Sequence, residues 1–227
     1  MIGPDGTAGG RTYGQGMRTT ILLLVVLALA PSASAAQRFY RVTGGTTTIT
    51  FSDAWLAVLA QGSVQFAGVD GTKVTATNRK DGPPIIRATF KVRKARGNIL
   101  TYGSGSPSVT AKHRGGLAFS SLDRPGVVSF RDPGLIGFPG ANRIDGVLPN
   151  ERDVDRTPFL SAPQFKVGRP HGGEVRIVMR DVTWCYTGWM VFGATWDAPP
   201  TDDPWFPKAA MNAVVGDAVA VLDVKRR

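Results

Sequence analysis

The chain has 227 residues, of which 42% are hydrophobic and 19% are charged, and this balance excludes an intrinsically disordered protein. The formal net charge of +10 favours anionic surroundings such as nucleic acid, an acidic wall polymer or anionic lipid, but spread charges of this kind also suit a solvated surface. A single cysteine, Cys185, excludes an intramolecular disulfide and any metal site built from cysteine pairs. Because Cys185 lies in an aromatic and apolar run, we expect a buried and inert thiol.

The start of the chain predicts export. A charged segment at Met17-Arg18 precedes the apolar run 21–30, and Pro31 and small residues at 33–36 follow, which is the three-part pattern of a secretory signal peptide. The apolar run is about half of the ~20 residues that span a bilayer, so we expect no transmembrane anchor in the mature form. The expected divisions are an upstream extension at 1–16, a signal peptide at 17–36, and a single secreted or cell-wall-associated domain at 37–227.

Short alternating segments, rich in threonine and separated by glycine and proline, predict a mainly β domain: an antiparallel, sandwich-like sheet with two short helices. Ser52 is expected to cap a helix that runs through Ala60, and the second helix is expected at 208–215. Residues 132–163 are rich in Gly, Pro and Asp and are expected to form a loop-rich insertion. The expected strands are 38–51 (two short strands around Gly44-Gly45), 63–67, 73–77, 84–96, 108–112, 116–121, 127–130, 174–182, 184–192 and 218–224.

Motifs of the common enzyme classes are absent, so we expect a non-catalytic protein. The two histidines, His113 and His171, do not form a His-Glu-x-x-His pattern, and no Gly-x-Ser-x-Gly or P-loop segment is present. Carboxylate pairs for glycoside hydrolysis can lie far apart in the sequence, so an unrecognised extracellular hydrolase stays open as an alternative.

Three segments together carry a family resemblance. They are Thr46 to Phe51 with the helix that follows, the run Lys-His-Arg-Gly-Gly-Leu-Ala-Phe-Ser at 112–120, and the Ala-rich run at 207–216. In this order they resemble secreted actinobacterial proteins of the HtaA type, in which an Ala-rich helix precedes a His-x-Gly-Gly-Leu hairpin. The resemblance implies a binding module at the cell surface and makes haem the leading named ligand.

In the resembled family, a tyrosine supported by a histidine is said to bind haem. His113 stands at the position of that histidine, whereas Ala60-Gln61-Gly62 replaces the tyrosine expected after the first helix. Tyr102 and Tyr186 are therefore the substitute candidates, and His171, which also precedes a Gly-Gly pair, is a further ligand candidate. A turn histidine that bonds the backbone is the alternative interpretation of His113.

A second hypothesis is electrostatic binding of an acidic wall polymer or other polyanion, without specific recognition of nucleic acid. The candidate residues lie on one segment: Arg87, Lys91, Arg93, Lys94 and Arg96. Alternation along a strand would divide these cations between two faces. Binding of this kind should weaken steeply as the salt concentration rises.

Overall fold

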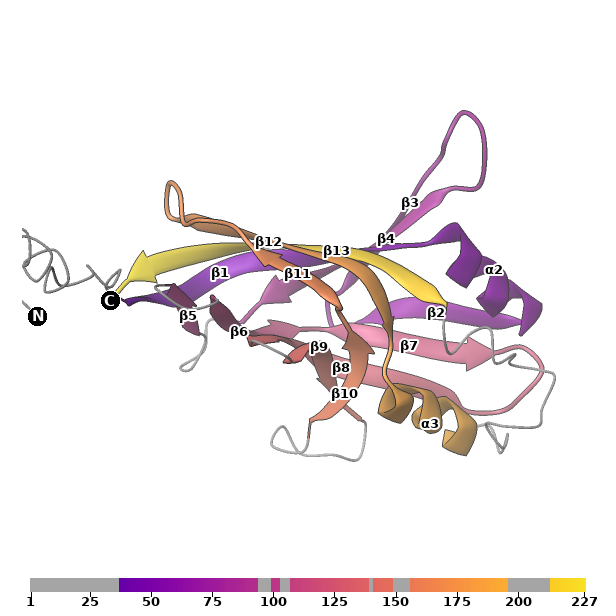
Figure 1. The fold of residues 1–227 in the computed structure, drawn as a ribbon. Coiled ribbons are helices and arrows are strands. Elements are labelled where there is room, and N and C mark those ends of the chain that lie inside the picture. Colours follow the sequence, from indigo (N-terminus) through magenta and orange to yellow (C-terminus); the bar gives the residue numbers. More distant parts are fainter. Residues whose placement is uncertain (1–36, 94–98, 103–106, 139–140, 149–155, 196–212) are drawn as a thin grey trace, which may run out of the picture. The chain divides into compact units, whose positions relative to one another are not determined.

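The computed structural model describes residues 37–93, 99–102, 107–138, 141–148, 156–195 and 213–227 (Figure 1). The expected extension, the signal peptide and residues 208–212 of the expected second helix lie outside these described residues. In chain order the elements are β1 (Arg38–Phe51), α2 (Asp53–Gln61), β2 (Val64–Val69), β3 (Lys73–Thr77), β4 (Ile85–Val92), β5 (Ile99–Tyr102), β6 (Ser108–Arg114), β7 (Gly116–Ser121), β8 (Val127–Phe138), β9 (Ala141–Val147), β10 (Thr157–Ser161), β11 (Gln164–Val167), β12 (Glu174–Trp184), α3 (Tyr186–Thr195) and β13 (Val214–Arg226).

Among the described residues the fold is mainly β and antiparallel with two helices, as predicted from the sequence. Eight strands pair in a closed ring, in the order β1, β4, β6, β8, β9, β10, β12, β13 and back to β1. The sheet therefore closes into an eight-stranded barrel with extra strands, which is consistent with the expected sandwich-like β domain. The other strands extend it: β3 pairs with β4, β11 with β12, β7 with β8, β2 with β7, and β5 with both β1 and β6.

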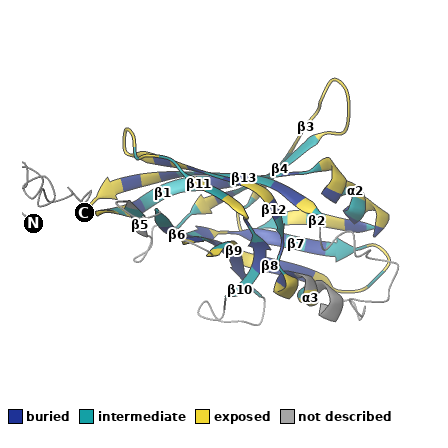
Figure 2. Cartoon of the chain, viewed as in Figure 1, coloured by how far each residue is buried: buried dark blue, intermediate teal, exposed yellow. Residues whose placement is uncertain are grey.

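Alternating residues of the ring strands fill its interior. On β13, Ala218, Ala220 and Leu222 are fully buried, while the residues between them are only partly covered (Figure 2). On β4, Ala88 and Phe90 are buried and lie on one face, as the sequence predicts. An eight-stranded barrel is just narrow enough for such side chains to fill it. The interior is consequently a packed core.

Strand β8 changes partner at a bulge. Its first half pairs with β7 up to Arg131, and its second half pairs with β6 from Gly134 onward. Asp132 at the corner has a positive φ of 47°, and its backbone N–H donates to the Gly115 carbonyl at 2.6 Å. The register against β9 shifts at the same place, as is usual for a β-bulge. The corner brings the Pro133 carbonyl within hydrogen-bond reach of β6.

The expectation of a loop-rich insertion at 132–163 is wrong for the described part of that segment. It holds the end of β8 together with β9 and β10. The glycines serve close packing: a Cβ on Gly134 would overlap the Asp145 carboxylate, and a Cβ on Gly137 would overlap the Phe165 ring. Glycine in a strand can mark such close approach as well as a turn.

The expectation of a strand at 184–192 is also wrong. Residues 186–195, which follow the end of β12, form helix α3. The Cys185 N–H donates to the Phe159 carbonyl at 2.9 Å, and the Thr187 hydroxyl donates to the Pro158 carbonyl at 2.7 Å. Gly188 lies so close to the Phe159 backbone that a Cβ would come within 2.8 Å of it. These contacts with β10 hold α3 in place, and a strand-like sequence pattern does not reveal them.

The first helix is confirmed, since Ser52 caps α2 and accepts a hydrogen bond from the Trp55 N–H at 3.1 Å. Trp55 anchors α2 in an aromatic cluster and stacks on Phe51 with 5.1 Å between ring centroids. The other members are Phe66, Phe119, Phe130, Phe159 and Trp184. At the chain end, 214–215 begin β13 where the second helix was expected to finish.

Candidate functional site

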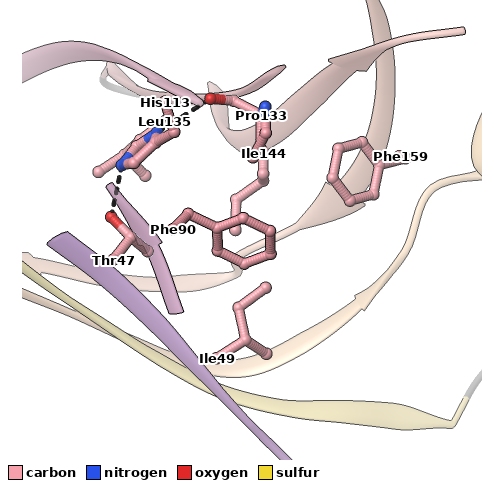
Figure 3. A pocket seen from close by; sticks show the side chains of 8 residues that line it. All are labelled: Thr47, Ile49, Phe90, His113, Pro133, Leu135, Ile144 and Phe159. Carbon is pink, nitrogen blue, oxygen red and sulfur yellow. Dashed lines mark hydrogen bonds between the residues drawn. The ribbon is translucent and has the colours of Figure 1, made fainter. Parts of the chain in front are cut away.

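His113 lies inside the barrel and is 2% exposed. Its position on β6 lets it reach two other strands (Figure 3). The ring Nδ1 lies 2.9 Å from the Pro133 carbonyl oxygen on β8, and Nε2 lies 2.7 Å from the Thr47 hydroxyl on β1. The side chain therefore ties together the bulge of β8, strand β6 and strand β1.

These contacts define the protonation state of His113. A carbonyl oxygen can only accept, so Nδ1 carries the proton and Nε2 accepts from the Thr47 hydroxyl. Burial lowers the pKa of His113 to about 4, the Pro133 carbonyl opposes this shift, and the Arg156 charge adds to it. His113 is consequently neutral at physiological pH.

The cavity beside His113 is small. It is lined by Thr47, Ile49, Phe90, His113, Pro133, Leu135, Ile144 and Phe159 (Figure 3). The free space is about 10 Å³, which is close to the room needed by one water molecule. Pockets for cofactors and drug-sized ligands run from about 300 to 1,000 Å³. Because both ring nitrogens are hydrogen-bonded and the space is so small, haem does not fit at His113. The contacts favour a histidine that bonds the backbone, although it lies on strand β6 and not in the expected turn.

A buried ion pair lies near the same corner. Asp145 is 2% exposed, and its Oδ1 accepts from Arg156 Nε at 2.8 Å. Arg156 also donates to the backbone carbonyl of Asp132. The pair lies beside the β8 bulge, and Oδ1 of the Asp145 carboxylate is engaged by Arg156.

The other candidate haem ligands with described side chains, His171 and Tyr186, do not lie beside His113. His171 is exposed in the turn between β11 and β12, where it forms a bridge with Glu174. Tyr186 is 67% exposed at the start of α3. Tyr102 ends β5, and its side chain lies outside the described residues. No haem site is therefore assembled from the described side chains of this set.

The predicted polyanion-binding residues have different surroundings. Arg87 and Lys91 project from the outer face of β4, because the buried Ala88 and Phe90 point inward between them. Arg93 forms an ion pair with Asp132 at 3.0 Å. Lys94 and Arg96 lie outside the described residues.

Strand register places further cations and hydroxyls beside Arg87 and Lys91. On β1, Thr50 pairs with Arg87, Thr48 with Thr89, and Thr46 with Lys91. On the neighbouring strands, Lys73 of β3 pairs with Thr89, and Arg114 of β6 pairs with Lys91. We call this outer surface the threonine–cation face: Thr46, Thr48, Thr50, Lys73, Arg87, Thr89, Lys91 and Arg114.

The positive charge of this face is not neutralised by the described part of the protein. No described carboxylate forms an ion pair with Lys73, Lys91 or Arg114, and Arg87 donates instead to the Thr77 hydroxyl at 3.4 Å. Two acidic residues border the face, and each forms an ion pair outside it: Asp132 with Arg93, and Asp217 with Arg180. Lys91 and Arg114 also stand directly opposite each other, and such like-charge pairs are destabilising.

No family model, curated protein or solved structure matches the chain. The resemblance to proteins of the HtaA type therefore stays a prediction. Within the described residues, the helices are too short or too polar to cross a membrane. Among the same residues, no group of three or more His, Cys, Asp or Glu side chains is placed to hold a metal ion.

Several residues of these sites were not singled out from the sequence. The alternation of Thr46, Thr48 and Thr50 was a visible signal for one face of a strand. The places of Lys73 and Arg114 depend on pairing with β4, which the sequence does not specify.

Cys185, which was expected to be buried and inert, is only partly buried. Burial still raises the pKa of its thiol and favours the unreactive protonated form.

Proposed function

We propose that the protein is a secreted, non-catalytic module that binds an anionic polymer of the cell surface on the threonine–cation face. The observation that carries this proposal is the set of four cations, Lys73, Arg87, Lys91 and Arg114, without a carboxylate partner among the described residues. The signal peptide expected at 17–36 supports a place outside the cytoplasm.

Holding Lys91 opposite Arg114 costs the free protein stability. A cross-strand pair of like charges costs stability unless an anion lies between or above the two groups. A bound polyanion would supply that charge and would release its counterions on binding. The pair is thus a feature that weakens the free protein and strengthens the complex.

The site around His113 gives less support to the haem-binding and hydrolase hypotheses. Haem coordination would require His113 to give up a buried hydrogen bond on one of its ring nitrogens. Hydrolysis would require converging carboxylates, and the cavity beside His113 has none in its lining.

Removing the opposed charges tests the proposal. We expect Lys91→Gln combined with Arg114→Gln to weaken binding to a soluble polyanion by about 30-fold, because each basic residue contributes roughly 1 kcal/mol near an anionic surface. The free energy of unfolding should rise by roughly 0.2–1 kcal/mol as the repulsion is relieved. Fluorescence titration with alginate and urea unfolding measure the two effects.

The matched control is Arg143→Gln, which removes one exposed cation from β9, the strand opposite β1 in the ring. It should change the affinity by less than about twofold, since it lies away from the face. Equal weakening by Arg143→Gln and by either single variant of the pair would show that net charge alone drives binding, and the assignment of the face would be wrong.

A further inference from the structure

Hydroxyl groups run beside the cations in a second, parallel row. Thr46, Thr48 and Thr50 occupy alternate positions of β1, so they share its outer face at intervals of about 6.6 Å. Strand β4 lies about 4.8 Å away and carries Arg87 and Lys91 in register with this row. An extended ligand lying along β1 and β4 would contact the cations of β4 on one side and the hydroxyls of β1 on the other.

The side-chain hydroxyls of Thr46 and Thr50, at the two ends of the row, are available to a ligand. The Thr48 hydroxyl lies 3.1 Å from that of Thr89, so these two satisfy each other. Within the described part of the chain, the side chains of Thr46 and Thr50 form no hydrogen bond with protein. A hydroxyl can both donate and accept, which suits pairing with the hydroxyls of a sugar.

The cations of the face are evenly spaced along β4, and no aromatic side chain lies among them. Measured along β4, Arg87, Lys73 and the Lys91–Arg114 pair follow one another at steps of two residues, or about 6.6 Å. The face therefore offers no aromatic side chain on which bases could stack.

We infer that the anionic polymer is an acidic polysaccharide, bound through its charges by the cation row and through its hydroxyls by Thr46 and Thr50. This inference rests on the proposed function, because it names the polymer held on the same face. A polymer that carries anions without hydroxyls, such as polyphosphate, uses the cation row alone.

The test combines Thr46→Val with Thr50→Val, which removes both hydroxyls and keeps β-branched side chains that suit a strand. The probes are alginate, a polymer of uronic acids, and polyphosphate, each at the same ionic strength. We expect the variant to bind alginate about tenfold more weakly and polyphosphate within about twofold of the unchanged protein. Thr183→Val, at a half-buried position of β12, is the matched control and should alter neither affinity.

The outcomes separate this inference from the proposed function. If the charge variants weaken both probes while the threonine variant leaves alginate unchanged, the inference is overturned and the proposed function stands. The inference is also overturned, and the proposed function still stands, if the unchanged protein binds polyphosphate or single-stranded DNA more tightly than alginate. If the charge variants weaken neither probe, the proposed function itself is wrong. Near-UV circular dichroism of each variant confirms that the fold is kept.

Discussion

Replacing Arg156 with methionine is expected to destabilise the fold by about 3–5 kcal/mol, because the substitution leaves the Asp145 carboxylate buried without its partner. It also removes the donor to the Asp132 carbonyl at the β8 bulge. Urea unfolding at neutral pH, followed by tryptophan fluorescence, measures the loss. The midpoint should fall with an unchanged slope if the transition stays two-state.

The double variant Arg156→Met with Asp145→Asn is the control for this prediction. Removing the charge together with its partner relieves most of the penalty for an unpaired buried ion, so the double variant should be clearly more stable than Arg156→Met alone. Equal stability of Arg156→Met and the unchanged protein would show that the pair is solvated and does not support the bulge.

Acidification is expected to weaken the fold through His113. The pKa of His113 is about 4 in the folded protein, against the ordinary value of 6.5 for a histidine exposed to solvent in the unfolded chain, so the unfolded chain takes up the proton first as the pH falls. The stabilisation by the neutral, doubly hydrogen-bonded ring is complete above pH 6.5 and is lost progressively toward pH 4. Two and a half pKa units correspond to roughly 3 kcal/mol.

The measurement is the free energy of unfolding between pH 7.5 and about 4, compared with that of His113→Gln. Glutamine keeps polar atoms but does not titrate, so its curve should lack this share of the slope, although the variant is less stable at neutral pH. Parallel curves for the two proteins would mean that His113 is already accessible to protons in the fold. The difference between the curves removes the contribution of carboxylates that titrate in both.

The parts of the fold that sequence analysis anticipated depend on local patterns. Ser52 before an apolar helical run predicted the start of α2, and the alternation of Ala88, Phe90 and Val92 predicted the buried face of β4. Helix α3 was missed because its aromatic and β-branched residues suit a strand, and its conformation depends on contacts with Phe159. Local preference is a weak guide where tertiary contacts decide.

The sites depend still more on long-range pairing. His113 was selected as a candidate, but its partners are Thr47, which is 66 positions away, and the carbonyl of Pro133 at a bulge. Closure of the ring of strands brings these groups together, and no sequence motif indicates that they are in contact. In the same way the charges of Arg87 and Lys91 were visible, whereas the ion pair that engages Arg93 requires the fold of β8.

The central claim is that an anionic polymer binds on the threonine–cation face, and amide NMR spectra recorded during titration with an alginate oligosaccharide test it most directly. We expect the largest shifts at Thr46, Thr50, Lys73, Lys91 and Arg114, and little change at Arg143 on the opposite strand. The account would be contradicted by spectra that do not change, or by shifts that centre on His171 or on α3 and leave β1 and β4 unaffected.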